Sequence, residues 1–138
     1  MSEAEAPTLY DQIGGLDTFR RLVDAFYARV ERDSVLRPLY PESLREPRDH
    51  LALFLAQYFG GPTTYSEMRG HPRLRARHLR FAIGQRERDA WVRHMTGALY
   101  ETNVSEPALS EMREYFEQAA TFLINQDWPG RRPTDEIL

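Results

Sequence analysis

The stretch YFGGPTTYSEMRGHPRLRARHLRF, residues 58–81, decides which fold this chain adopts. Its GGP triplet, residues 60–62, ends the preceding helix, because glycine pairs and proline do not continue a helix. Residues 62–71 are expected to form a loop, and Pro72 is expected to open a short helix. That helix contains one histidine, His78, and four arginines: Arg73, Arg75, Arg77 and Arg80. A helix that only packed would not need the histidine, and a helix that only bound acidic groups would not need the apolar residues among the arginines.

The apolar neighbours of His78 lie on its own side of the expected helix. Leu74 lies one turn before it and Phe81 three residues after it, so the three share one face. A b-type haem needs a neutral imidazole on iron, an apolar slot, and cations near its propionates. This segment offers all three, with Arg77 placed to reach a propionate. From these residues alone, a histidine in an ordinary surface helix remains the simpler interpretation.

Other metal centres find less support in the sequence. The chain has four histidines and no cysteine. No two histidines have the close spacing of a helical zinc motif. A carboxylate-bridged di-iron bundle would need Glu-x-x-His motifs, and the sequence contains none. Both types of centre are therefore set aside.

The composition predicts one domain, residues 1–138, because 138 residues is an ordinary domain length. No apolar run is long enough to span a membrane, and the acidic start, MSEAEAPTLYD, does not resemble a secretory signal. A net charge of −3 gives no reason to expect a nucleic-acid partner. We therefore expect a cytoplasmic protein with neither membrane nor nucleic acid as a partner. All 18 basic residues are arginine, which we attribute to codon bias rather than to heat adaptation.

Helical periodicity predicts an all-α fold, and no segment alternates as a half-buried strand would. Asp17 is expected to cap the first long helix, and Pro47 to begin the second. The expected helices cover residues 17–32, 47–59, 72–81, 86–101 and 105–123. A short turn is expected at 35–39, and residues 1–7 and 126–138 are expected to be tails.

Five segments resemble truncated haemoglobins, in particular the second group of that family. They are LYDQIGGLDTF (9–19), AFYARV (25–30), LRPLYPE (36–42), FLAQYFGGPTTYSEMRGHPRLRARH (54–78) and ERDAWVRHM (87–95). The resemblance covers about residues 8–125. It implies a truncated globin, a two-over-two helical sandwich around a haem, in which the first helix is vestigial and the proximal helix is cut to about one turn.

The resemblance also implies roles for individual residues. His78 falls on the proximal iron ligand, while Tyr27, Tyr40 and Trp91 fall on the distal positions that act on the bound gas. Pro47 lies near the position of the distal histidine in ordinary globins, so no histidine gate is expected. The other residues expected to contact the cofactor, haem b, are Arg77 and Tyr65 at the propionates, His50 as a weaker candidate there, and Leu51, Phe54, Leu74, Phe81 and Met95.

One residue departs from the family pattern. Members often place proline just before the phenylalanine that follows the ligand, and here that position is Arg80. The departure affects the expected local turn and leaves the assignment of the ligand unchanged.

This pocket is expected to bind O2 tightly and reversibly at a five-coordinate iron. Trp91, Tyr27 and Tyr40 offer N–H and O–H donors to a ligand that carries partial negative charge. Each such bond contributes about 1.5–3 kcal/mol, so one bond slows O2 release by roughly ten- to a hundred-fold. The expected gas ligands are O2, NO and CO.

Three functions remain open at this point. The first is an enzyme that converts NO to nitrate, or handles peroxide, with a separate reductase as electron donor. The second is a protein for O2 storage, transport or sensing without turnover. The third is a protein-interaction module that carries no iron. The oligomeric state is also open, with a homodimer among the options.

Overall fold

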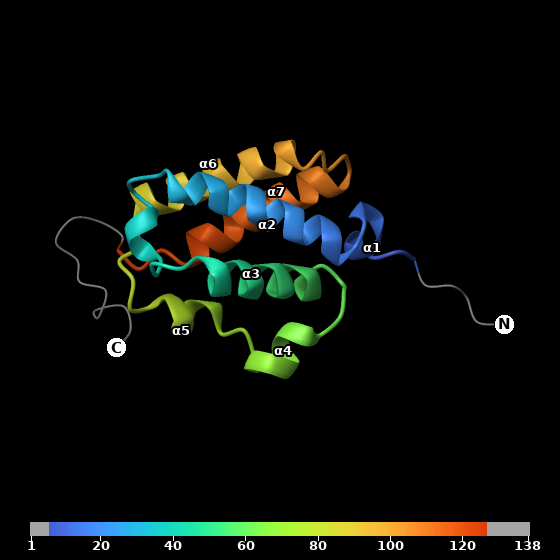
Figure 1. Cartoon of the computed structure of the whole chain (residues 1–138), viewed down its shortest axis with the longest axis horizontal. Coiled ribbons are helices and arrows are strands. Elements are labelled where there is room, and N and C mark those ends of the chain that lie inside the picture. Colours follow the sequence, from blue (N-terminus) through green and yellow to red (C-terminus); the bar gives the residue numbers. More distant parts are fainter. Residues whose placement is uncertain (1–5, 127–138) are drawn as a thin grey trace.

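The computed structural model describes residues 6–126, which are helical and contain no strand, as the all-α prediction requires (Figure 1). None of the helices described there is long and apolar enough to cross a lipid bilayer. The elements, in chain order, are α1 (Leu9–Ile13), α2 (Leu16–Glu31), the 3-10 helix η1 (Arg37–Leu39), α3 (Arg45–Tyr58), α4 (Thr64–Arg69), α5 (Leu74–His78), α6 (Gln85–Glu101) and α7 (Ala108–Phe122). The expected tails lie almost entirely outside the described residues.

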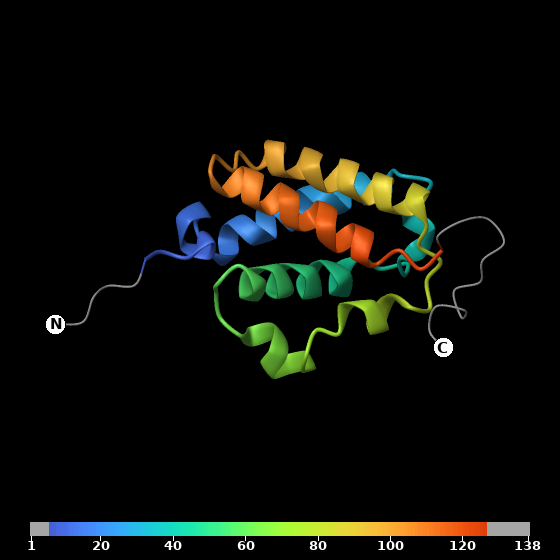
Figure 2. The ribbon, with the colours of Figure 1, turned by 180° about the vertical axis from the view of Figure 1, so that it is seen from behind.

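The four long helices form two packed pairs, α2 with α3 and α6 with α7. Helix α2 packs against both α3 and α6, and α6 packs against α7. Figure 2 shows α6 and α7 side by side, with α3 below them and the short helices α4 and α5 at the lower edge. The arrangement confirms the expected two-over-two sandwich. Helices α1 and α5 have five residues each, in agreement with the expected vestigial first helix and proximal helix of about one turn. The helix expected over 72–81 is therefore shorter at both ends, and it begins at Leu74 rather than at Pro72.

Helix α2 forms the centre of the core because its apolar residues recur every three or four positions. Those on the buried face are Phe19, Leu22, Val23, Phe26, Tyr27 and Val30. The expectation that Asp17 caps this helix is wrong. Gly14 and Gly15 have positive φ angles of 112° and 75°, which glycine adopts readily. Gly14 ends α1 as its C-cap, and Gly15 begins α2 as its N-cap. Asp17 instead lies in the first turn.

Two expected boundaries near α3 need correction. The helix begins at Arg45, two residues before Pro47, which the first turn accommodates because its amide groups need no intrahelical acceptor. The expected loop 62–71 contains helix α4. Gln57 on α3 fixes the position of α4. Its side-chain oxygen accepts from the Ser66 amide at 2.9 Å, and its side-chain amide donates to Ser66 Oγ at 2.7 Å. A helix of six residues is too short to show periodicity in the sequence.

The turn after α3 lies directly against α1. The amide of Tyr10 donates to the carbonyl of Phe59 at 3.0 Å, and the Tyr10 ring covers the following turn. A Cβ on Gly61 would lie 2.6 Å from that ring and 2.8 Å from the carbonyl oxygen of Ala56. Glycine is therefore required at position 61 by close packing.

Replacing Gly61 with alanine is expected to lower the free energy of unfolding by about 1–3 kcal/mol, the usual range for overpacking. Gly84→Ala is the matched control, because its Cβ would meet no atom closer than 3.4 Å. Urea denaturation of both variants measures the difference. Equal stabilities would contradict the packing argument for the turn.

Candidate functional site

A cavity of about 700 Å³ opens between α3, α5, α6 and α7, within the size range of small-molecule and cofactor sites. All but one of the expected site residues line it: Tyr27, Tyr40, His50, Leu51, Phe54, Tyr65, Leu74, Arg77, His78, Phe81 and Trp91. The exception is Met95, which is completely buried in the core and does not line the cavity. It follows Trp91 by four residues, about 6 Å further along α6, which carries it past the cavity.

His78 lies on one wall of the cavity in a defined orientation. Its Nδ1 donates to the carbonyl oxygen of Leu74 at 2.6 Å, one turn earlier in α5. Burial lowers the pKa of His78, against a smaller raising by the hydrogen bond to the Leu74 carbonyl and with a further lowering by the nearby Arg77, so the ring is neutral near pH 7. A neutral imidazole whose Nδ1 is engaged presents Nε2 as the free nitrogen, which is how histidine binds a metal.

The segment that follows His78 is held by a residue far away in the sequence. Asn125, which is only 1% exposed, donates from Nδ2 to the carbonyl of Phe81 at 2.7 Å and of His78 at 3.3 Å. Its Oδ1 accepts from the amide of Ile83 at 2.9 Å. Sequence reasoning missed this residue, and an isolated asparagine gives no signal of burial.

Replacing Asn125 with leucine should leave the carbonyl of Phe81 and the amide of Ile83, both in partly buried residues, without their side-chain partner. Each unsatisfied group costs about 1–3 kcal/mol, so we expect a loss of about 3 kcal/mol in unfolding free energy. Gln126→Leu is the control, because no hydrogen bond of its side chain is found among the described residues. Thermal unfolding distinguishes the two variants, and an unchanged Asn125→Leu protein would show that the anchor is dispensable.

The aromatic donors line another part of the cavity. The rings of Tyr27 and Tyr40 meet edge to face at 5.4 Å, and Trp91 packs on Phe26 at 5.2 Å. Burial raises the pKa of Tyr40 to about 12, against a smaller lowering by hydrogen bonds with Trp91 and Tyr27. Burial also raises the pKa of Tyr27. Both phenols therefore keep their protons at neutral pH and can donate to a ligand.

Basic groups line the margin of the cavity. Arg77 donates from Nε to the carbonyl of Pro72 at 2.8 Å and from Nη2 to the carbonyl of Arg69 at 3.0 Å. Arg69, which sequence reasoning missed, lies 2.9 Å from His50 Nε2 and has its guanidinium carbon 5.9 Å from the ring centroid of Tyr65. Its Nε is buried without a partner among the described residues. An orphaned guanidinium N–H at this margin suits an acidic ligand such as a propionate.

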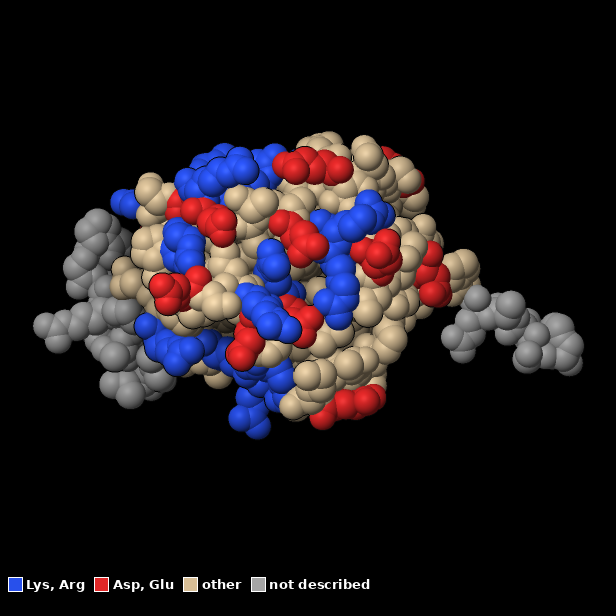
Figure 3. Space-filling view, viewed as in Figure 1, with Lys and Arg blue, Asp and Glu red and all other residues tan. Residues whose placement is uncertain are grey.

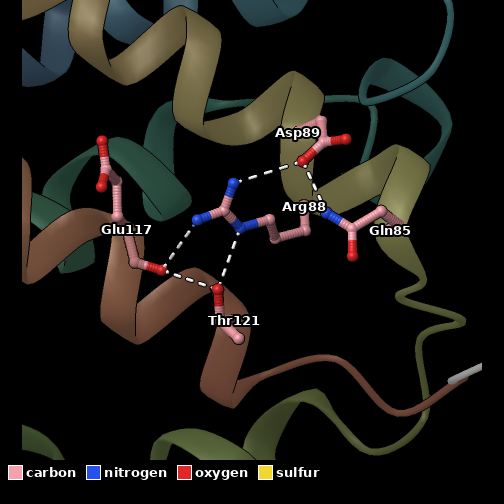
Figure 4. Close-up of polar contacts among 5 residues, drawn as sticks. All are labelled: Gln85, Arg88, Asp89, Glu117 and Thr121. Carbon is pink, nitrogen blue, oxygen red and sulfur yellow. Dashed lines mark hydrogen bonds and ion pairs between the residues drawn. The ribbon is translucent and has the colours of Figure 1, made fainter.

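Arg88, another lining residue, joins α6 to α7 beside the cavity (Figure 4). Its Nε donates to Thr121 Oγ1 at 3.0 Å, and its Nη2 to the carbonyl of Glu117 at 3.2 Å. Its Nη1 pairs with Asp89 at 3.2 Å. These contacts fix the spacing of the two helices that carry Trp91 and the α7 wall.

The residues present fit a haem. They supply a neutral imidazole with a free Nε2, a largely apolar cavity of cofactor size, and guanidinium groups at its margin. Aromatic N–H and O–H donors line the same cavity. On a two-over-two helical sandwich, these features define a globin.

Comparison with known proteins gives the family. A family model described as bacterial-like globin matches residues 8–125. The group 2 truncated hemoglobin YjbI of Bacillus subtilis (strain 168) is 39% identical over 121 residues, which cover 85% of this chain and 88% of that protein. This chain therefore belongs to the bacterial-like globin family and is a group II truncated haemoglobin, which implies haem and oxygen binding.

Solved structures agree with this assignment. The hemoglobin of the thermophilic phototrophic bacterium Chloroflexus aurantiacus is 60% identical, with a TM-score of 0.87 over 88% of this chain and 100% of that one. The group II truncated hemoglobin of Bacillus anthracis is 35% identical, with a TM-score of 0.88 over 92% of this chain and 98% of that one.

Proposed function

We propose that this protein holds a b-type haem through Nε2 of His78 and uses bound O2 to oxidise NO to nitrate. The observation that carries the proposal is the hydrogen bond from His78 Nδ1 to the Leu74 carbonyl, which orients a neutral ring in the cavity wall. Arg69 and Arg77 would pair with the propionates. When bound, the haem supplies an iron centre that takes up O2 and accepts single electrons.

The protein's own residues would determine how long O2 stays in the pocket. Tyr27, Tyr40 and Trp91 line the cavity, and the two phenols remain protonated. Donors placed before the ligand arrives stabilise developing negative charge without a cost of reorganisation. Slow release of O2 favours its consumption in the pocket over its delivery elsewhere.

Turnover requires an electron from outside the chain. The overall conversion, NO plus O2 plus one electron to nitrate, balances only if a separate reductase restores the ferrous state. The same site would also suit the two-electron reduction of peroxide to water, with the electrons drawn from that reductase by way of the oxidisable side chains that line the cavity, Trp91, Tyr27 and Tyr40. O2 storage or transport without turnover is the second candidate, favoured by the same gas-binding pocket.

Stopped-flow mixing of the oxygenated protein with NO tests the proposal. We expect loss of the oxy spectrum within the mixing experiment and one nitrate formed per haem. Persistence of the oxy spectrum would favour storage or transport. A purified sample that shows no Soret band after addition of haem would instead indicate an interaction module without iron.

A further inference from the structure

Beside the cavity lies a group of arginines without acidic partners in the described part of the chain. From Met68 to Gln85 the sequence has no acidic residue and five arginines, although the net charge of the whole chain is −3. We call these five the arginine surface: Arg69, Arg73, Arg75, Arg77 and Arg80. Figure 3 shows basic side chains gathered at the lower edge of the molecule, on the side of α5.

None of these five arginines forms an ion pair with a carboxylate among the described residues, whereas six other arginines do. On the rest of the described chain, Arg20 pairs with Asp49, Arg29 with Glu101 and Arg88 with Asp89. Within residues 6–126, no carboxylate lies within salt-bridge distance of any member of the arginine surface. Their guanidinium groups instead contact carbonyls, rings or solvent, which neutralise no charge.

The haem itself would not neutralise this surface. Arg69, Arg77 and Arg80 line the cavity, where two propionates would offset two charges. Three of the five positive charges would therefore remain without a partner among residues 6–126. Arg73 and Arg80 are exposed to solvent.

Apolar side chains flank the charges. Met68 is 61% exposed and Phe122 is 56% exposed. Arg75 is ordered against Phe122, donating to its carbonyl at 2.6 Å with the guanidinium carbon 5.6 Å from its ring centroid. Arginine, methionine and aromatic residues are the types enriched where proteins bind one another, while lysine and acidic residues are depleted there.

We propose that the arginine surface, with Met68 and Phe122, docks the acidic face of the protein that donates electrons to the haem; this rests on the proposed function above. A protein partner fits better than a nucleic acid, because the molecule as a whole is acidic and the exposed apolar groups favour a mixed interface. On docking, one electron passes from the reduced carrier to ferric iron, giving ferrous iron and oxidised carrier, with no bond made or broken.

Reduction of the ferric, haem-loaded protein by an acidic plant-type ferredoxin tests the proposal. The ferredoxin has a reduction potential of about −400 mV, low enough to drive the transfer. Stopped-flow measurement under nitrogen gives the second-order rate constant at several salt concentrations. We expect the constant to fall steeply as salt rises, because attraction between opposite charges is screened.

Charge reversal locates the effect. Arg73→Glu should slow reduction about three-fold at low salt, and Arg73→Glu with Arg80→Glu about ten-fold with a flatter salt dependence. Arg21→Glu is the matched control, since it changes net charge by the same amount near the start of α2. Arg80 lines the cavity and Arg73 does not. If the double variant loads haem poorly, the comparison of Arg73→Glu with Arg21→Glu therefore remains a valid test.

Titration calorimetry with oxidised ferredoxin measures docking without any O2 chemistry. Weaker binding by the Arg73 variant supports the proposal, even if the NO experiment fails. Equal rates and equal binding for Arg73→Glu and Arg21→Glu would overturn it. Tighter binding of a single-stranded oligonucleotide than of ferredoxin at the same salt would overturn it as well.

Discussion

Replacing His78 with glycine is expected to abolish stable anchoring of the haem. The ring lost is the only histidine on the α5 wall of the cavity, and the Leu74 carbonyl would lose the group it orients. We expect the Soret band of the reconstituted variant to weaken and shift, and the haem to transfer readily to a competing apoprotein. Added imidazole should restore the band in part, because the glycine leaves room for a free ligand.

His71→Gly is the control for this experiment. His71 is exposed and does not line the cavity, and its Nδ1 accepts from the amide of Arg73 at 3.2 Å. Its spectrum should match that of the unmodified protein. An unchanged Soret band and unchanged haem transfer in His78→Gly would show that the iron ligand lies elsewhere.

Faster escape of O2 is the expected result of removing either distal donor. Trp91→Phe deletes the indole N–H, and Tyr40→Phe deletes a phenol whose burial raises its pKa to about 12. A hydrogen bond to a charged partner contributes about 1.5–3 kcal/mol, so each variant should release O2 roughly ten- to a hundred-fold faster. Flash photolysis or displacement by CO measures the rate.

Tyr100→Phe supplies the matched control, since Tyr100 is 55% exposed and accepts from Arg113 at 3.3 Å, away from the cavity. Its O2 dissociation rate should be unchanged. CO is less polar than O2, so its release should change less in the distal variants. If Trp91→Phe and Tyr40→Phe both release O2 at the unmodified rate, these residues do not hold the ligand.

The long helices were predictable because each buries a face with a regular spacing of apolar residues. Helix α2 shows this most clearly, with Phe19, Leu22 and Phe26 all fully buried. The short elements carry no such signal. Helix α4 depends on the side chain of Gln57, nine residues before its partner Ser66, and single-residue tethers of this kind leave no pattern in a sequence.

Most residues that line the candidate site were named from the resemblance, whereas contacts between distant parts of the chain were not predicted. His78 could be named from its segment and the family pattern. Arg69 and Asn125 act through geometry that only the folded chain creates, a stacked guanidinium near Tyr65 and a buried amide 47 residues from His78. Met95 was expected to contact the haem, but the structure places it in the core, four residues beyond Trp91 along α6.

The distant anchoring of the proximal segment also bears on when the protein can mature. During synthesis, the peptide groups of residues 78–83 emerge from the ribosome more than 40 residues ahead of the side chain that fastens them. A nascent chain that ends before residue 125 would carry His78 on a segment whose backbone lacks the hydrogen bonds of the Asn125 side chain. Stable haem binding should therefore occur late, after almost the whole domain has emerged from the ribosome rather than during its translation.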